Sequence, residues 1–168
     1  MPYLIATMAT SVHQLLSIRG LISLFVLSSF TLITKSSEAQ NSNVIEAKVN
    51  AFFSDFAKKD TNALRNYFRF EPSLQSAFIN KKGESVLSEE SLSDFLIGIA
   101  SIPDSIHFEE RITKITVLED GILAIAYCQY EFYINQHLSH VGVDVFTFFN
   151  DLKDWKIIQL CDTRRQKK

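Results

Sequence analysis

The chain has 168 residues, of which 46% are hydrophobic and 21% are charged, and its formal net charge is −2. This length and composition predict one globular domain rather than a disordered chain. Lys and Arg are not in excess, so the chain lacks the charge that neutralises phosphates. We therefore expect no binding to nucleic acid.

The N-terminal segment is predicted to be a secretory signal peptide over residues 1–39. Arg19 precedes an uncharged, largely apolar run over residues 20–34, and Ser37-Glu38-Ala39 places small residues before a cleavage site after Ala39. A basic, then apolar, then small-residue order is typical of such signals. The alternative is an uncleaved membrane-anchoring helix, but the apolar run is shorter than the roughly 20 residues that span a bilayer. We expect a secreted or periplasmic protein with no membrane contact after cleavage, and a single domain over residues 40–168.

Three helices are predicted in the first half of this domain. Apolar residues recur at three- and four-residue spacing over residues 42–58, which indicates an amphipathic helix. A short second helix over Thr61–Phe68 follows, capped by Asp60. Pro72 is expected to end that region, and residues 78–87 to form a small hairpin. Ser88-Glu89-Glu90 reads as the start of a third helix that ends before Pro103, because it supplies a cap and two acids in the first turn.

Four strands are predicted in the second half, because the hydrophobic period changes from 3.6 to 2 after Ile106. They cover residues 107–117, 122–134, 138–150 and 155–163, with short turns that favour antiparallel pairing. Helices followed by antiparallel strands predict an α+β fold with three N-terminal helices packed on an antiparallel sheet. The strands are apolar on both faces, so we expect helices on one face and a second subunit on the other, as a homodimer.

Two cysteines remain after removal of the signal peptide, Cys128 and Cys161. An oxidising compartment would favour a disulfide. Their predicted strands lie on either side of a third strand, however, and strands two apart are separated by roughly 9–10 Å. That separation is beyond the reach of a disulfide, so two buried free thiols are predicted.

The order of these elements resembles the nuclear transport factor 2-like superfamily, including its SnoaL-like members. The matching pieces are Asp60-Thr-Asn-Ala-Leu at the second helix, Asp120-Gly121 between strands, and Trp155-Lys156-Ile157 opening the last strand. His140-Val-Gly-Val-Asp144 and Asp162-Thr-Arg-Arg165 look like a bacterial subgroup that is mostly of unassigned function. The resemblance implies a cone of three helices against a strongly curved, cystatin-like sheet, with a cavity at its open end. Relatives use that cavity as an isomerase, hydrolase, cyclase or dehydratase site, or only for binding, and many are dimers through the outer face of the sheet.

The candidate catalytic residues are Asp144, Asp162, Arg164 and His140. Asp162 and Arg164 are two residues apart and so share a face of a strand, with Asp144 on the neighbouring predicted strand. Such a cluster can position a water molecule and polarise a substrate oxygen. It resembles the Asp-Arg-Asp arrangement of limonene epoxide hydrolases by residue type, although the Asp-x-Arg pair lies here on the last strand. The structural alternative is an ion pair that fixes the C-terminal strand. His140 shares the parity of Asp144 and can act as a general base or as a hydrogen-bonded rim residue.

The candidate ligand-binding residues are Tyr127, Tyr130, His107 and His140. A tyrosine hydroxyl can donate to an oxyanion, as in ketosteroid isomerases, but a buried tyrosine more often has its hydroxyl satisfied within the core. No histidine has the spacing of a metal ligand, and phosphate-binding loops, nucleophile elbows and Cys-x-x-Cys are absent, so we expect no metal and no cofactor.

Three functions follow as hypotheses. The first is binding of a small, largely apolar molecule in the cavity without turnover. The second is a cofactor-independent hydrolase or isomerase that uses Asp144, Asp162 and Arg164. The third is an envelope protein-interaction module that uses the face of its sheet.

Overall fold

The structure, a computed structural model, describes the backbone of residues 23–166 and the side chains of residues 40–166. Contacts divide the chain into two units, Met1–Thr34 and Lys35–Lys168. In the first unit the described residues, 23–34, are helical. Part of the predicted signal peptide, residues 1–22, lies outside the described residues, so its cleavage and the secretion of the protein stay predictions. Over residues 23–166, no helix combines the length and apolarity that a membrane crossing requires.

The helices form largely where hydrophobic spacing predicts them. Helix α1 spans Ser23–Ala57 and therefore begins earlier than the predicted residue 42. Its buried residues in the second unit repeat at three- and four-residue spacing and are Ile45, Val49, Phe52 and Phe53. Helix α2 covers Thr61–Tyr67, and the Asp60 carboxylate accepts a hydrogen bond from the backbone N–H of Ala63, as expected of its cap.

Helix α3 covers Leu92–Ala100, and its N-cap is Ser91, whose hydroxyl accepts from the backbone N–H of Asp94 at 3.0 Å. The prediction that Ser88-Glu89-Glu90 opens this helix was wrong. Those residues belong to strand β2, Ser85–Glu90, where they pair with β1. Ser91 and Asp94 also form a helix-capping pattern of a serine followed by an acid. Because Ser88 is held in the β1–β2 pairing, Ser91 is the serine that caps the helix.

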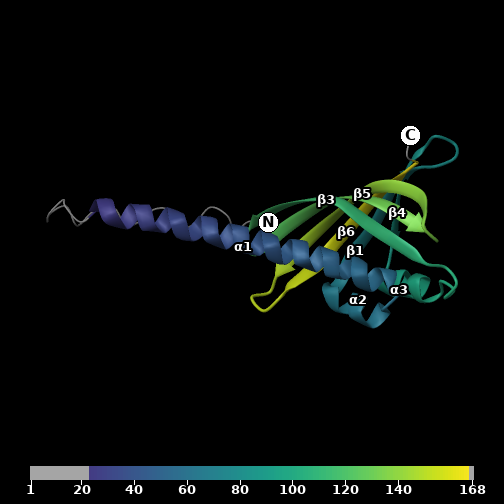
Figure 1. Cartoon of the computed structure of the whole chain (residues 1–168), viewed down its shortest axis with the longest axis horizontal. Coiled ribbons are helices and arrows are strands. Elements are labelled where there is room, and N and C mark those ends of the chain that lie inside the picture. Colours follow the sequence, from purple (N-terminus) through teal and green to yellow (C-terminus); the bar gives the residue numbers. More distant parts are fainter. Residues whose placement is uncertain (1–22, 167–168) are drawn as a thin grey trace, which may run out of the picture. The chain divides into compact units, whose positions relative to one another are not determined.

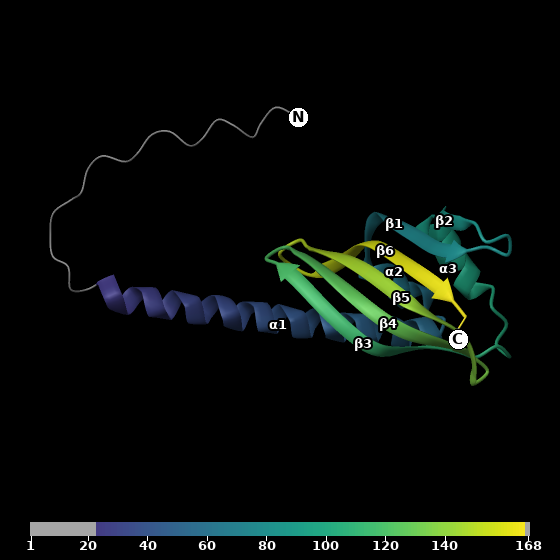
Figure 2. The same cartoon turned by 90° about the horizontal axis from the view of Figure 1, so that it is seen from above.

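Within residues 23–166 the sheet has six strands in the order β2-β1-β6-β5-β4-β3, which Figure 2 shows side by side. The four predicted strands are present, as β3 (Phe108–Asp120), β4 (Leu123–Ile134), β5 (His137–Asn150) and β6 (Trp155–Arg165). The predicted hairpin is extended by a long β1, Phe68–Ile79, that passes through Pro72. Strand β1 pairs with β6 in parallel, so the sheet is mixed rather than wholly antiparallel. The register of that pairing shifts between Phe68 and Ser73, where Glu71 has a φ of 52°.

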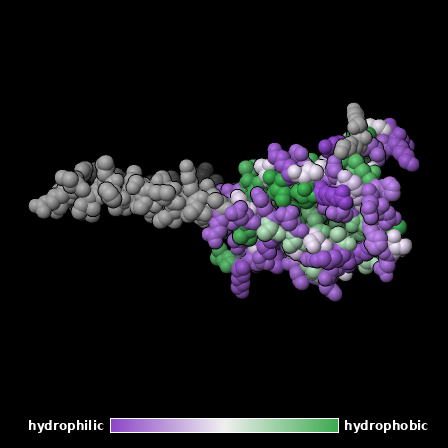
Figure 3. Space-filling view, viewed as in Figure 1, coloured by the Kyte–Doolittle hydropathy of each residue, from purple (hydrophilic) through white to green (hydrophobic). Residues whose placement is uncertain are grey.

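The strands arch over the C-terminal part of α1 and over α2 and α3 (Figure 1), which places the core between the helices and one face of the sheet. Strand β4 shows the expected alternation, because Ala124, Ala126 and Cys128 are buried against the helices. Ile125 and Tyr127 point to the other face and are 38% and 44% exposed. In the space-filling view, apolar residues reach the surface between hydrophilic ones (Figure 3). The homodimer through the face of the sheet away from the helices stays a prediction.

The two cysteines lie as predicted on β4 and β6, with β5 between them. Both are free. Cys128 is buried, whereas Cys161 is only half-buried. The register pairs Cys161 with Val145 and places it in one row with Tyr127, two strands away, on the face of the sheet away from the helices. The prediction of two free thiols is therefore confirmed, but only one of them is fully buried.

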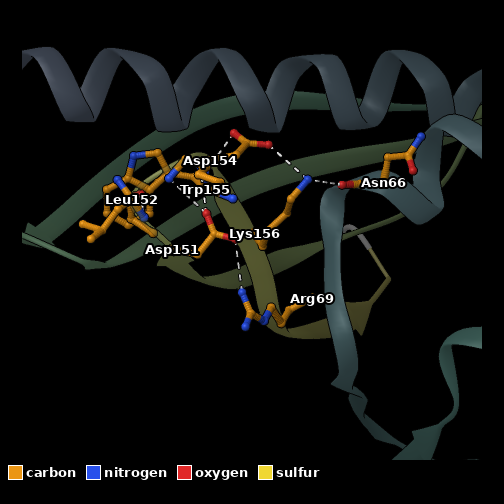
Figure 4. A network of polar contacts seen from close by, with 9 residues as sticks. Asn66, Arg69, Asp151, Leu152, Asp154, Trp155 and Lys156 are labelled. Carbon is orange, nitrogen blue, oxygen red and sulfur yellow. Dashed lines mark hydrogen bonds and ion pairs between the residues drawn. The ribbon is translucent and has the colours of Figure 1, made fainter.

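A polar network fastens the β5–β6 turn to the helical layer (Figure 4). Asp154 forms ion pairs with Lys48 of α1 at 2.7 Å and with Lys156 at 3.1 Å. The ammonium group of Lys156 also donates to the backbone carbonyl of Asn66 at 2.7 Å, at the end of α2. These contacts hold the start of β6 in place, and β6 carries two of the predicted site residues.

Candidate functional site

A cavity of about 230 Å³ lies between the helices and the inner face of the sheet. One part of its wall is apolar and largely aromatic, and consists of Phe52, Phe53, Phe56, Leu74, Phe95, Phe132 and Leu160. The rings pack against one another: Phe56 stacks on Phe95 with ring centroids 6.2 Å apart, and its centroid lies 4.8 Å from that of Phe108. The helices α1 and α3 thus supply four of these rings, which face the sheet, and β4 supplies Phe132.

The sheet supplies the polar part of the wall. The strand register aligns Ser76, Asp162 and Asp144 across β1, β6 and β5. The polar lining residues are Gln75, Ser76, Glu90, Glu110, Tyr130, His140, Asp144, Asp162 and Arg164. The cavity therefore has an aromatic side and an acidic side.

Asp162 and Arg164 form an ion pair, as their spacing predicts. Arg164 Nε donates to Asp162 Oδ2 at 2.8 Å, and Arg164 Nη2 donates to Ser76 Oγ at 3.3 Å. The Ser76 hydroxyl in turn donates to Asp162 Oδ1. The side chain of Arg164 is 56% exposed while that of Asp162 is 15% exposed, so the pair lies towards the rim of the cavity. The Asp162 carboxylate raises the pKa of Arg164 although burial acts against it.

Asp144 has a different partner, Glu110 of β3. Asp144 is 4% exposed, and its Oδ2 atom is buried without a hydrogen-bond donor, as is the Oε1 atom of Glu110. Burial raises the pKa of Glu110 to about 7. Burial and the neighbouring Glu110 raise the pKa of Asp144 well above its usual range. Two buried carboxyl groups within hydrogen-bonding reach cannot both be charged without large cost, so they share a proton near neutral pH.

Sequence reasoning missed Glu110, although a signal for it was present. Phe108 and Ile112 flank it at two-residue spacing and face the core, which puts Glu110 on the inner face of β3. Glu109 points to the opposite face, where it pairs with Arg111 at 2.8 Å. A carboxylate at an inward position between two apolar residues is the pattern that identifies it.

His140 and Tyr130 line the cavity, as two of the ligand-binding predictions require. The His140 ring stacks on Phe132 with centroids 4.8 Å apart, and burial and then Arg164 lower its pKa. The Tyr130 hydroxyl donates to the backbone carbonyl of Thr163 at 2.9 Å, and burial raises its pKa. Because the hydroxyl proton is already donated to Thr163, Tyr130 stabilises the fold in this structure and does not donate that proton to a ligand.

The other two predicted ligand-binding residues lie elsewhere. Tyr127 is 44% exposed on the outer face of the sheet, because its neighbours Ala126 and Cys128 face inward. His107 is exposed just before β3, where its backbone N–H donates to the side chain of Asn135 at 3.0 Å. Neither residue lines the cavity. Within the part of the chain that the structure describes, no group of three or more His, Cys, Asp or Glu residues is placed to hold a metal ion.

No protein-family profile and no curated protein matches the sequence. Solved structures do match the fold. A nuclear transport factor 2-like protein of unknown function from Shewanella baltica OS155 superposes with a TM-score of 0.56 and 13% identity, over 77% of this chain and 97% of that one. A proposed dehydratase of the same family from Streptomyces avermitilis gives a TM-score of 0.59 and 11% identity, over 77% and 99%.

A third similar structure is a nuclear transport factor 2-like protein with a cystatin-like fold from Novosphingobium aromaticivorans, with a TM-score of 0.56 and 13% identity, over 89% of this chain and 94% of that one. At these identities the likeness establishes the fold and leaves the SnoaL-like subgroup a prediction. The chain has the cystatin-like fold of the nuclear transport factor 2-like proteins, as the order of its helices and strands predicted.

Proposed function

We propose that the protein binds a small molecule with a largely apolar body in the cavity between its helices and its sheet. The observation that carries this proposal is a 230 Å³ space walled on one side by aromatic rings and on the other by carboxyl groups. Ligand sites in proteins are typically apolar cavities with a few fixed polar groups that orient the ligand. The volume is below the roughly 300 Å³ at which drug-sized sites begin, so the ligand is compact.

Binding does not require turnover, and two of the polar groups of the cavity, Arg164 and Tyr130, already have partners within the protein. Arg164 is held by Asp162 and Ser76, and the Tyr130 hydroxyl by Thr163. These pairs support a rigid wall, which lowers the cost of ordering the site when a ligand enters.

The second candidate is a cofactor-independent hydrolase or isomerase. The observation that favours it is Glu110, whose pKa of about 7 suits proton transfer at neutral pH. In this reading Glu110 and Asp144 exchange a proton with the substrate, and Arg164 polarises an oxygen near the rim. The two candidates share the cavity and differ in whether the bound molecule leaves unchanged.

Binding is tested by isothermal titration calorimetry of the full chain against a panel of compact aromatic and alicyclic alcohols, ketones and amines. Leu160→Trp fills the apolar wall and is expected to weaken every binder at least tenfold. Ile125→Trp is the matched control, since Ile125 lies on the outer face of the same sheet and is 38% exposed. If no compound binds, or if Leu160→Trp binds like the wild type while remaining folded, the proposal is wrong. Unchanged compounds recovered after incubation distinguish binding from turnover.

A further inference from the structure

The cavity is lined by more carboxyl groups than positively charged groups. Four lining residues have carboxyl groups, Glu90, Glu110, Asp144 and Asp162, and one has a guanidinium group, Arg164. Arg164 is paired with Asp162. His140 does not supply a second cation at neutral pH, because burial lowers its pKa. The remaining three carboxyl groups therefore lack a positive partner among the lining residues.

Among the described residues, no further positively charged group faces the Glu110–Asp144 pair. The helices α1 and α3 contribute only phenylalanines to the wall, and β1 contributes Leu74, Gln75 and Ser76. The titratable or charged groups facing the pair are Glu90 of β2, Cys128 and Tyr130 of β4, His140 of β5, and Asp162 and Arg164 of β6. Burial raises the pKa values of Cys128 and Tyr130, so both stay uncharged near neutral pH.

We propose that the ligand of this cavity is a compact organic cation, a primary ammonium group on an apolar, aromatic-sized body, whose N–H groups take the place of the proton between Glu110 and Asp144. This inference rests on the proposed binding function and specifies the chemical class of the ligand. An ammonium group has three donors, and Glu110 Oε1 and Asp144 Oδ2 are two buried acceptors that have no donor other than the proton of the pair itself.

Two further features favour a cation over a neutral or anionic ligand. A carboxylate or phosphate placed beside this pair would add like charge in a site of low polarity, which is strongly unfavourable. The opposite wall consists of phenylalanine rings of α1 and α3, including Phe56 and Phe95, and the faces of such rings attract ammonium groups. A hydroxyl compound would fit the same volume, but it would leave the shared proton and the excess acid in place.

Proton exchange follows from this arrangement. Near neutral pH Glu110 is the group of the pair that titrates, so an ammonium group that displaces the Glu110 proton releases it to solvent, and the cation binds more tightly as the pH rises through that range. Glu110 titrates with a pKa of about 7. For release of one proton with that pKa, the Kd of the amine is expected to fall about tenfold between pH 6 and pH 8.

The test compares 2-phenylethylamine with 2-phenylethanol, two probes of nearly equal size, by titration calorimetry of the full chain at pH 6 and pH 8. Each titration at pH 6 is repeated in two buffers of different ionisation enthalpy, which counts the protons released. We expect the Kd of the amine to fall about tenfold with pH, the Kd of the alcohol to stay constant, and close to one proton to leave per amine bound at pH 6.

The variants Glu110→Gln and Asp144→Asn are each expected to weaken amine binding at pH 8 at least tenfold and to weaken alcohol binding much less. Glu109→Gln is the matched control on the same strand, because Glu109 faces away from the cavity. The proton count on the wild type keeps the test decisive even if a variant does not fold.

Each outcome has a distinct meaning. An alcohol that binds as tightly as the amine at both pH values, or amine binding without proton release, overturns the cation inference while cavity binding stands. Failure of both probes together with the whole compound panel overturns the proposed binding function itself. Amine binding that persists in folded Leu160→Trp shows that the cation lies outside the cavity, and this also overturns the inference.

Discussion

Replacing Glu110 by Gln tests the carboxyl pair through stability, without any ligand. In the folded protein the pKa of Glu110 is raised from 4.5 to about 7. The folded state therefore binds more protons than the unfolded state between these pH values, and stability falls as the pH rises through this window. Each pKa unit corresponds to about 1.4 kcal/mol. Glu110 thus makes the folded protein about 3.5 kcal/mol less stable well above pH 7 than below pH 4.5, and about 2.5 kcal/mol of this falls between pH 5 and pH 8.

Gln is similar in shape and carries no titrating proton, so Glu110→Gln should remove the part of the pH dependence that Glu110 contributes, while burial keeps the pKa of Asp144 raised in both proteins. The free energy of unfolding of the variant minus that of the wild type is expected to grow by about 2.5 kcal/mol from pH 5 to pH 8. His140 acts in the opposite direction, since its pKa is lowered in the folded state. Its contribution is common to both proteins and cancels in the difference.

The assay is urea unfolding at pH 5, 6, 7 and 8, followed by the fluorescence of Trp155. This residue is the only tryptophan of the chain and is 4% exposed, so it reports the loss of the core. Glu109→Gln on the outer face should follow the wild type at each pH. A wild-type protein and Glu110→Gln whose unfolding free energies differ by a constant amount over this range would refute the buried, proton-sharing pair.

Three further predictions concern the rim, the backbone and the thiols. Asp162→Ala should cost about 1–2 kcal/mol in unfolding free energy, because Arg164 and Ser76 lose their shared acceptor; an unchanged melting temperature would show that this pair does not stabilise the fold. Gly142→Ala should cost more than about 3 kcal/mol, since its Cβ would overlap the Thr163 carbonyl oxygen and lie 2.5 Å from the Tyr130 hydroxyl. Gly98→Ala in α3 is the control, with nothing within 4 Å of its Cβ, and should stabilise by about 1 kcal/mol; equal urea midpoints for the two variants would contradict this. A thiol-reactive reagent should modify half-buried Cys161 in the folded protein and both cysteines only after unfolding; rapid labelling of Cys128 in the folded state would count against its burial.

The candidate site was only partly predictable from the sequence. Asp162 and Arg164 were found because a two-residue spacing on a strand fixes their common face. Asp144 was found as an ionisable residue inside an apolar strand, and it was expected to form one cluster with Asp162 and Arg164. The partner is Glu110, which the strand order places two strands away on β3, with its carboxyl group in contact with that of Asp144 on the inner face of the sheet.

Tyr127 is a residue that the sequence pattern wrongly assigned to the cavity. Aromatic residues occur at both parities of β4, so the pattern alone does not say which of them face the helices. The helices cover the face that carries Ala126, Cys128 and Tyr130, and this leaves Tyr127 outside the cavity.

The sequence by itself determined the helices, the four long strands, their order and the α+β class, because hydrophobic periodicity and caps act between near neighbours in the chain. Only the tertiary structure decided the parallel pairing of β1 with β6, the use of Ser91 rather than Ser88 as the cap of α3, and the meeting of Glu110 with Asp144. These features depend on which strands lie side by side and which face the helices cover. Burial at that face is what turns two ordinary carboxylates into a pair that holds a proton near neutral pH.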